Sequence, residues 1–484
     1  MILEQIAVLW PLAIAVVDVI AAAGCTVHIV LRKRDVRAAI GWTGVVWLAP
    51  IIGSAAYVGF GINRIQRRAA SLDIRDCRYS KKSVELTAED HRIGAEFLEE
   101  HPQMGGLAHL LRQLTGTIPL PGNRVTTLVN GDETYPAMLR AIDEATQSIT
   151  LLTYVFDSDW IGDRFLESLK RAHERGVLVR VLIDDVGARY SRPTMIARLR
   201  KAGVPVAPFL PTRIPRLIQY ANLRNHRKIL VVDGRIGFTG GTNIRGGHCL
   251  QANPGFPVQC MHFRLDGPIV AHLQQAFVVD WNFAAGEVLV GDEWFPPLDR
   301  AGDVWALGIS DGPDEDFEKL TDTLIGALSI SRETVRIATP YFLPDAGLIQ
   351  ALNSAALRGV DVRIYLPQGN NIPLVSWASM PHIEQLLEKG CRVFFVAPPF
   401  DHTKLFVVDR AWSLIGSTNW DPRSLRLNFE FNVACFNNAL GEHLVEAMDR
   451  KEEFAREVTL DDITGRPFPV QLRDGLARLL SPYL

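Results

Sequence analysis

The most constraining feature of this sequence is a frame that occurs twice. One copy runs from Asn225 to Asn243 as NHRKILVVDGRIGFTGGTN, and the other runs from Asp401 to Asn419 as DHTKLFVVDRAWSLIGSTN. Each copy has His-x-Lys, then an aspartate, and ends in Thr-Asn. A single His-x-Lys triplet is common by chance, but two copies in one register indicate an internal duplication.

Each frame contains a short apolar run that predicts a β-strand. In the first copy the run is Ile229–Val232, and an equivalent run follows the lysine of the second copy. Side chains two positions apart on a strand point to the same face. His226 and Lys228 are therefore expected to project together, as are His402 and Lys404.

The asparagines that close the frames, Asn243 and Asn419, are expected to complete two polar patches. Each apolar run leads into a tight turn and a returning strand. We expect this turn to place Asn243 opposite His226 and Asn419 opposite His402. Each half then offers an imidazole, an ammonium group and an amide, and two such patches facing each other form a phosphate pocket.

Asp233 and Asp409 follow the apolar runs at the turn. They belong to the repeated frame and are therefore candidate catalytic residues. Their place at a turn favours a second interpretation, in which they are structural anchors. The sequence favours the structural interpretation and leaves the catalytic one open.

The residue types in the two patches point to phosphoryl transfer. A neutral imidazole can attack phosphorus, and a second, protonated imidazole can give a proton to the leaving alkoxide. Lys228, Lys404 and the two asparagines can hold the non-bridging oxygens as charge builds. Ammonium groups beside the histidines repel divalent ions, so no metal and no other cofactor is expected. The alternative is that these are core histidines whose hydrogen bonds are satisfied within the fold. It requires two lysines to be buried beside them without an anionic ligand, which is costly in free energy.

The repeated frame resembles the two His-x-Lys-x4-Asp motifs of the phospholipase D superfamily. Further segments are similar to bacterial cardiolipin synthases, namely VNGDETYPAML around Tyr135, YVFDSD from Tyr154, ATPYFLPD from Ala338 and WDPRSLRLNFE from Trp420. The resemblance covers nearly the whole chain. It implies a phosphohistidine intermediate and a phospholipid substrate.

The resemblance also implies roles for individual residues. His226 would be the nucleophile and His402 the general acid, with the roles exchanged in the second step. The two frames are too alike for the sequence alone to separate these roles. Glu430 in LNFE matches the carboxylate that accepts a hydrogen bond from a catalytic histidine, and an exposed strand charge is the alternative.

One position departs from the family pattern. Where the family usually has an aspartate two residues before the histidine of a Trp-Arg-Asp-x-His segment, VQCMHFRLDGP has Cys260 before His262. A thiol is a poor substitute for a carboxylate as a hydrogen-bond acceptor. The departure is expected to affect how the first histidine, His226, is held. Whether Asp266 or another acid takes over is left open.

The N-terminal part of the chain is expected to lie in a membrane. Ile6–Leu31 and Ala38–Ile62 are apolar stretches, each long enough to cross a hydrocarbon core of about 30 Å, and together they predict a two-helix transmembrane hairpin. The start, MILEQ, has no basic region, which disfavours a secretory signal peptide. Two buried helices of a soluble domain are the alternative. Basic residues flank the spans on both sides, so the orientation is left open.

The rest of the chain predicts two similar α/β halves. The assigned boundaries are 1–66 for the transmembrane hairpin, 67–122 for a connector, 123–291 for the first half, 292–313 for a linker and 314–484 for the second half. Each half has a strand, a helix and a second strand in order, at 148–156, 161–175 and 176–182 and again at 334–342, 346–358 and 359–365. This alternation predicts mixed or parallel sheets covered by helices. The duplication predicts pseudo-twofold packing that brings the two frames face to face.

Composition narrows the classes of function. The net charge is −3, whereas a dedicated nucleic-acid binder carries a basic surplus, so nucleic acid is not expected as a partner. The six cysteines lack the spacing of a zinc site or a disulfide framework.

The function implied by the resemblance is a phosphatidyltransferase, multi-pass in the bacterial inner (plasma) membrane. It would condense two molecules of phosphatidylglycerol into cardiolipin and glycerol. The alternatives are a phospholipase D-type hydrolase that uses water as acceptor, a nuclease of the same superfamily, and a membrane scaffold that has lost turnover. The oligomeric state is not predicted.

Overall fold

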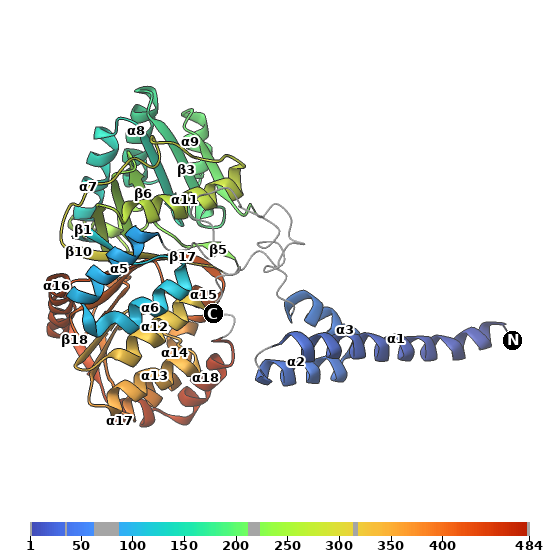
Figure 1. Ribbon diagram of the computed structural model, residues 1–484. Helices are drawn as coiled ribbons and strands as arrows, with labels where there is room; N and C mark the ends of the chain where they lie inside the picture. The colour runs from blue at the N-terminus through green and yellow to red at the C-terminus, as the bar shows by residue number, and fades with distance from the viewer. Residues whose placement is uncertain (1, 34–35, 62–86, 212–222, 313–317, 482–484) are drawn as a thin grey trace. The chain divides into compact units, whose positions relative to one another are not determined.

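The protein is described by a computed structural model (Figure 1), which covers residues 2–33, 36–61, 87–211, 223–312 and 318–481. The described residues form two compact units. Residues 2–33 and 36–61 belong to an N-terminal unit of helices. The other described residues form a large α/β unit that contains both repeated frames.

Among the described residues of the N-terminal unit, one helix is long and apolar enough to cross a membrane. This helix, α1, spans Ile2–Arg32, and its apolar part is Ile14–Arg32 with 19 residues. Three shorter elements follow, namely α2 (Val36–Leu48), α3 (Pro50–Ala56) and the π-helix η1 (Tyr57–Gly61).

The predicted two-helix hairpin is not confirmed, because the second apolar stretch is broken. Ala49 has a non-helical backbone and Pro50 begins a new helix, so α2 ends after 13 residues. A Cβ on Gly53 would lie 2.3 Å from the carbonyl oxygen of Val45, which shows that α3 packs directly against the backbone of α2. Neither helix alone reaches the roughly 20 residues that a span requires.

The α/β unit is built on one 16-stranded sheet in which the same strand order occurs twice, and its sixteenth strand, β5 (Arg224–Asn225), pairs with β17 off the main order. The first-half strands, from the centre outward, are β1 (Leu120–Val129), β9 (Met261–Asp266), β7 (Ile236–Gly240), β6 (Ile229–Val232), β2 (Ser148–Thr153), β3 (Leu178–Asp184) and β4 (Val206–Phe209). The second-half strands are β10 (Val304–Asp311), β17 (Asn428–Phe436), β16 (Trp412–Gly416), β15 (Leu405–Val408), β11 (Thr334–Ala338), β12 (Asp361–Pro367) and β13 (Arg392–Val396), with β18 (Ala455–Val458) added at the edge.

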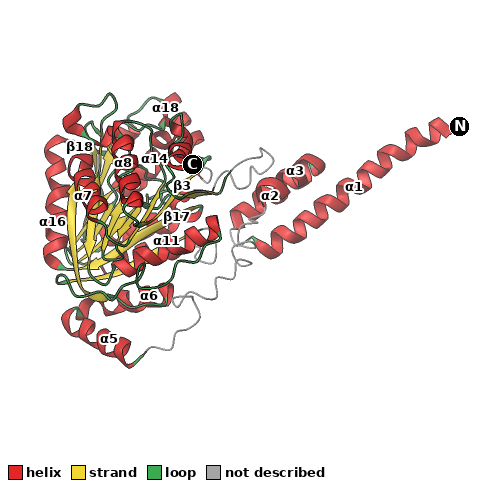
Figure 2. Cartoon of the chain, turned by 90° about the horizontal axis from the view of Figure 1, so that it is seen from above, coloured by secondary structure: helices red, strands yellow, loops and turns green. Residues whose placement is uncertain are grey.

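The sheet is mixed, as the sequence predicts. The outer strands β2, β3 and β4 are parallel, as are β11, β12 and β13, because helices connect them. The inner strands pair antiparallel, and short turns join β6 to β7 and β15 to β16. Helices cover both faces of the sheet (Figure 2). The main ones are α7 (Asn130–Glu144), α8 (Trp160–Glu174), α9 (Met195–Lys201), α11 (Val270–Ala285), α12 (Lys319–Ile330), α13 (Ala346–Leu357), α14 (Pro373–Leu387) and α16 (Asn438–Asp449).

The two halves join where β1 and β10 pair antiparallel. Leu120 lies opposite Ala306, and Asn123 lies opposite Val304. Two equivalent strands that pair antiparallel are related by a twofold axis, so this junction lies on the pseudo-twofold axis of the unit. Residues 292–313 were expected to be a linker, but they contribute β10, which is the counterpart of β1. The Pro, Gly and acidic residues of this segment favoured a linker, but Val304–Asp311 is a strand that is buried along most of its length.

The connector packs on the second half. Its described residues contain two helices, α5 (Ala88–Glu100) and α6 (Gly105–Thr115). The helices are separated by a 3-10 turn that begins at Pro102, which cannot continue an α-helix. The indole Nε1–H of Trp305 on β10 donates to Glu100 Oε2 at 2.7 Å, which fixes α5 against the central strands.

Candidate active site

Two short strand pairs cross the pseudo-twofold axis and bring the frames together. β5 (Arg224–Asn225), just before His226, pairs parallel with the start of β17 in the other half. β14 (Phe400–Asp401), just before His402, pairs parallel with β8 (Val258–Gln259). The backbone N–H of His226 donates to Phe429, and that of His402 donates to Gln259, at 2.9 and 2.8 Å. Each histidine is thus anchored to the half that does not contain it.

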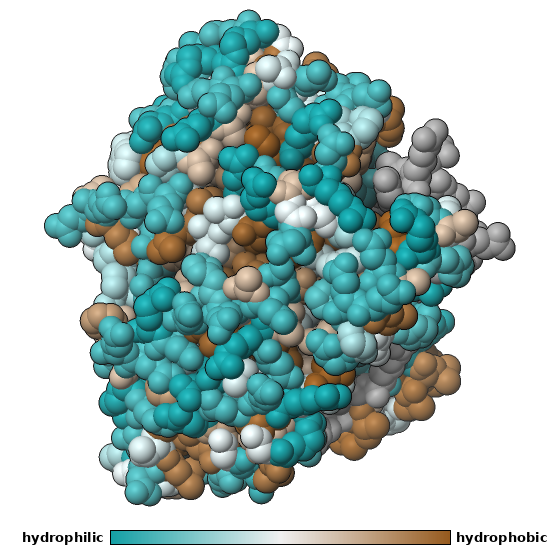
Figure 3. Space-filling model, turned by 60° about the vertical axis from the view of Figure 1, so that its left-hand side comes forward, coloured by the Kyte–Doolittle hydropathy of each residue, from teal (hydrophilic) through white to brown (hydrophobic). Residues whose placement is uncertain are grey.

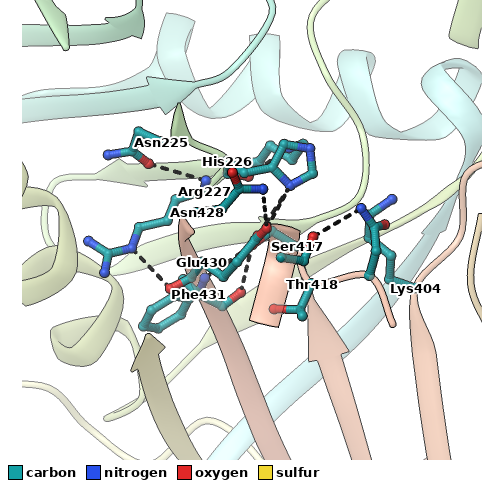
Figure 4. A network of polar contacts seen from close by, with 12 residues as sticks. Asn225, His226, Arg227, Lys404, Ser417, Thr418, Asn428, Glu430 and Phe431 are labelled. Carbon is teal, nitrogen blue, oxygen red and sulfur yellow. Dashed lines mark hydrogen bonds and ion pairs between the residues drawn. The ribbon is translucent and has the colours of Figure 1, made fainter. Parts of the chain in front are cut away.

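His226 is oriented by a carboxylate from the second half. Its ring nitrogen Nδ1 lies 3.0 and 3.2 Å from the two carboxylate oxygens of Glu430. A deprotonated carboxylate only accepts hydrogen bonds, so Nδ1 carries the hydrogen and donates it. The other ring nitrogen, Nε2, therefore has the free lone pair. The Glu430 carboxylate also accepts a hydrogen bond from the hydroxyl of Ser417 and one from Asn428 Nδ2 at 3.2 Å (Figure 4). The predicted role of Glu430 as an orienting carboxylate agrees with this geometry, and it is fully buried rather than exposed.

Burial and charge act in opposite directions on this pair. Burial raises the pKa of Glu430, but His226, Lys228 and Ser417 outweigh it and leave that pKa below its usual value. Burial lowers the pKa of His226 to about 4, although Glu430 favours the imidazolium form. Before substrate binds, the pair therefore consists of a neutral imidazole and an ionised carboxylate.

His402 is held by a weaker acceptor. Its Nδ1–H donates to the backbone carbonyl of Gly241 at 3.1 Å, and Gly241 belongs to the first frame. The Cys260 thiol donates to the carbonyl oxygen of His402 at 3.3 Å. Burial, followed by the charges of Lys404 and Lys228, lowers the pKa of His402 well below its usual value.

Cys260 affects the second histidine, not the first. The sequence suggested that the missing aspartate would alter how His226 is held, but His226 has Glu430 from the opposite half. Cys260 lies beside His402 because the strand pairs cross the pseudo-twofold axis. Asp266, the possible replacement, forms an ion pair with Arg264 at 2.9 Å and sits at the far end of β9.

The two lysines of the frames are buried in the same site. Lys228 Nζ donates to the carbonyl oxygen of His226 at 2.6 Å, and Lys404 Nζ donates to that of His402 at 2.8 Å. Burial lowers the pKa of Lys228 to about 7 and that of Lys404 to about 8, and each ammonium group lowers the pKa of the other frame's histidine. The Glu430 carboxylate offsets part of the positive charge of both ammonium groups, but burial outweighs it and keeps both pKa values low.

The asparagines do not lie where the sequence placed them. The hairpin loop holds three residues, because Val232 pairs with Ile236, and the register therefore puts Thr242 opposite His226. The second hairpin has the same register, with Val408 paired to Trp412. Asn243 Oδ1 accepts from the backbone N–H of Val155 at 3.3 Å.

Asn419 is the better placed of the two amides for a ligand. Its Nδ2 donates to Ser424 Oγ at 3.2 Å, while its Oδ1 is buried without a hydrogen-bond partner. Buried amide oxygens are normally satisfied, so the orphaned atom indicates a donor that arrives with the ligand or with water.

The aspartates of the frames contact backbone amides. Asp233 accepts from the N–H groups of Thr146, Gln147 and Ser148 at 2.8–3.2 Å. Asp409 accepts from three consecutive N–H groups at the start of β11, at 2.8–2.9 Å. Each carboxylate thus fixes the beginning of a strand. This geometry favours the structural interpretation, and a catalytic role stays a prediction.

Several residues around the site were not identified from the sequence. Arg227 lies between His226 and Lys228 and points the other way, where its guanidinium binds Asp280 at 2.7 Å. The alternation of side chains along a strand could have predicted that direction, but not the partner. Two aromatic rings approach the histidines: Tyr154 lies 5.3 Å from His226 and Tyr341 lies 6.5 Å from His402, centroid to centroid.

Within the described part of the chain, no group of three or more His, Cys, Asp or Glu residues has the arrangement of a metal site. The cations at the centre of the site are Lys228 and Lys404. Such a donor set suits an anion with several oxygens, such as a phosphodiester.

The family profile described as "Cardiolipin synthase, PLD-like domain" matches residues 138–281 and 324–451. The major cardiolipin synthase ClsA of Bacillus subtilis (strain 168) is 30% identical over 458 residues, covering 94% of this chain and 95% of that protein. A cardiolipin synthase of Listeria monocytogenes is 31% identical over 468 residues, covering 95% and 96%. Among solved structures, the phosphatidylserine synthase of Haemophilus influenzae Rd KW20 superposes with a TM-score of 0.62 at 15% identity. It covers 78% of this chain and 100% of that chain, and this likeness concerns the fold.

Proposed function

Because the chain belongs to the bacterial cardiolipin synthases of the phospholipase D superfamily, we propose that it condenses two phosphatidylglycerol molecules into cardiolipin and glycerol. The observation that carries the mechanism is the pairing of two histidines from duplicated frames over one cationic site. Each ring donates through Nδ1, which leaves each Nε2 available for chemistry.

In the first step, Nε2 of His226 attacks the phosphorus of one phosphatidylglycerol. The P–N bond forms and the bond from phosphorus to the glycerol headgroup oxygen breaks. His402, protonated at Nε2 once the anionic substrate is bound, gives that proton to the leaving glycerol alkoxide. The products are free glycerol and a phosphatidyl group on His226.

In the second step, the glycerol hydroxyl of another phosphatidylglycerol attacks the same phosphorus. Its proton passes to Nε2 of His402, the P–N bond breaks, and the lone pair returns to His226. Cardiolipin leaves, and both histidines are back in their starting protonation states. Water in place of the second lipid would give phosphatidic acid.

The contacts of the two rings support the assignment of the nucleophile. A phosphorylated imidazole that keeps its Nδ1–H carries a positive charge, which an ionised carboxylate stabilises better than a carbonyl oxygen does. His226 has the carboxylate of Glu430, whereas His402 has the carbonyl of Gly241. His402 is therefore suited to proton transfer and His226 to covalent catalysis.

Lys228 and Lys404 would hold the non-bridging phosphate oxygens, with Asn419 and Asn243 at the edge of the same site. The charge on these oxygens increases in the transition state, and buried ammonium groups stabilise it strongly because little water screens them. The bound phosphate in turn raises the pKa of both lysines from the low values of the empty site.

The enzyme is membrane-associated, and α1 supplies an apolar segment long enough for one crossing. We place it in the bacterial plasma membrane. A multi-pass arrangement would require α2, α3 and η1 to cross together as one broken segment. Labelling of single cysteines introduced near residues 36 and 58, from each side of sealed vesicles, tests this.

The mechanism is tested with a substrate whose leaving group needs no proton. With a p-nitrophenyl phosphodiester, His402→Asn should retain a burst of p-nitrophenol release and a phosphoenzyme trapped by rapid denaturation, whereas His226→Asn should show neither. Labelled phosphatidylglycerol in vesicles should yield cardiolipin plus glycerol with the unmodified enzyme. Label trapped on His402, or phosphatidic acid as the main product, would contradict the proposal.

A further inference from the structure

Helix α18 (Phe468–Arg478) turns its apolar side chains away from the body of the protein. Phe468, Leu472, Leu476 and Leu479 are all at least half exposed, and their spacing of four, four and three residues places them on one face. Asp474 and Ala477, on the other face, are buried against the α/β unit. A surface helix normally has the opposite arrangement.

The buried face of α18 packs next to the active site. Ala477 belongs to a cluster with Leu343 and Val375, and Tyr341 packs against the same cluster. The ring of Tyr341 lies 6.5 Å from that of His402. Arg473 stacks over Trp377 of α14 with its guanidinium carbon 4.5 Å from the ring centroid. Helix α18 therefore lies beside the second-half side of the site, with its leucines on the face exposed to solvent.

Three exposed apolar side chains from separate segments surround the same site. Tyr190 lies 6.4 Å from Tyr154, whose ring is 5.3 Å from His226. Ile372 follows Asn371, which accepts a hydrogen bond from the hydroxyl of Tyr341 at 2.9 Å.

Phe256 is the third of these side chains. It is 88% exposed, and its carbonyl oxygen lies 3.0 Å from the position of a Cβ on Gly247. His248, which follows Gly247 in the chain, has its ring centroid 6.4 Å from that of His402.

We propose that Tyr190, Phe256, Ile372, Leu472, Leu476 and Leu479 form a docking face that inserts into the lipid surface and holds the active site against it. The occupant is an anionic phospholipid bilayer. This inference rests on the lipid-transfer function, because both substrates and the product keep their acyl chains in the bilayer while the phosphates react.

The chemistry of the docking face fits that occupant. Apolar side chains on a helix with arginines at its flanks are typical of segments that lie in the membrane interface. Arg478 is exposed on α18, and such a group attracts anionic headgroups, whereas the guanidinium of Arg473 is paired with Asp474 at 2.7 Å. By contrast, the side of the molecule turned forward in Figure 3 is largely hydrophilic, with hydrophobic side chains scattered in small groups.

The test uses the full-length protein in vesicles of phosphatidylethanolamine and phosphatidylglycerol. A photoreactive p-benzoylphenylalanine replaces Leu476, and Leu357 is the matched control. Leu357 is similarly exposed, but it ends α13 just before β12 begins, whereas His402 lies near the other end of the neighbouring strand β11, where Ala338 pairs with Leu405. Irradiation should give lipid adducts at position 476 and few at position 357.

Adducts from position 476 to residues 1–61 of the same chain, or to a second copy, would overturn the proposal, as would equal lipid labelling at both positions. Because this readout needs no turnover, it stays informative even if the proposed mechanism fails.

A second measurement uses Leu472→Glu/Leu476→Glu, with Leu357→Glu as control. Cardiolipin formation on vesicles should fall about tenfold or more, since membrane binding follows the buried apolar area. The rate with dispersed short-chain phosphatidylglycerol should stay unchanged. An unchanged vesicle rate, or an equal fall with both substrates, would contradict the docking face.

Discussion

Glu430 and Cys260 occupy equivalent positions in the two halves of the protein, and only Glu430 contacts a histidine ring. Ile415 pairs with Val433, and Thr239, at the same place in the other frame, pairs with Phe263. Glu430 stands three residues before Val433, and Cys260 stands three residues before Phe263.

The equivalence extends one position further. Ser417, whose hydroxyl donates to Glu430, corresponds to Gly241, where a Cβ would lie 2.6 Å from the Cys260 sulfur. A Ser–Glu pair thus faces a Gly–Cys pair across the pseudo-twofold axis. The asymmetry separates two histidines whose sequence frames are nearly the same.

Cys260→Asp should make the site more symmetrical. A carboxylate near His402 would favour the imidazolium and raise the pKa of His402, so this residue would stay protonated to higher pH. The alkaline limb of kcat/KM is therefore expected to move upward by about one pH unit. Cys260→Ser, which adds no charge, is the control and should leave the profile in place. An unshifted limb in Cys260→Asp, with unchanged thermal stability, would argue against His402 as the proton donor.

Glu430→Gln should impair formation of the covalent intermediate. The amide keeps the size of the side chain but removes the charge that stabilises a phosphorylated His226, so kcat/KM should fall by about 10²-fold or more. The amount of trapped phosphoenzyme should fall with it. Glu452→Gln, a carboxylate that pairs with Arg363 in the second half, is the control. A loss of stability alone, with normal trapping per folded molecule, would reduce Glu430 to a structural role.

Asp233→Asn and Asp409→Asn should lower stability more than turnover. Each carboxylate accepts three backbone N–H groups at the start of a strand, and loss of the charge should cost about 2 kcal/mol of unfolding free energy per site. Asparagine tolerates the left-handed backbone at both positions, where φ is 52°, so strain is not added. Denaturant titration and kcat on the same sample separate the effects. A thousandfold fall in kcat at unchanged stability would instead assign the aspartates to the chemistry.

The ligand-free enzyme should lose stability in acid below pH 6.5. Burial lowers the pKa of His226 to about 4 and that of His248 and His262 to about 3. Between these values and the ordinary value of 6.5 the unfolded chain binds more protons than the folded chain, so stability falls as pH falls. The slope is about 1.4 kcal/mol per pH unit for each such histidine.

Melting temperatures measured between pH 7 and pH 4 check this expectation. His248→Gln should reduce the slope, whereas His443→Gln, on the exposed side of α16, should not. The same slope in both variants would count against buried neutral histidines as the cause.

Local patterns were sufficient to predict much of the fold. The alternation of strands and helices and the repeated frame predict a duplicated mixed α/β architecture, because hydrophobic period and turn residues act over short distances. The strands at 148–153 and 334–338 and the helices that follow them lie within a few residues of their predicted ranges. β10 was missed because nothing in its own residues reveals that it pairs with β1 across the molecule. The second apolar stretch was taken as one span because the effect of Pro50 depends on how α3 packs on α2.

The sequence by itself determined the groups for which we propose the chemistry, namely two histidines and two lysines in matching frames, since residue type and spacing decide the candidate reactive atoms and their shared strand face. Only the tertiary structure decided which partner each histidine receives. The crossed pairs β5–β17 and β8–β14 place Glu430 on His226 and leave His402 with a carbonyl. Partners so far apart in the chain meet through the closing of the two halves around their pseudo-twofold axis, and no local pattern encodes that closure.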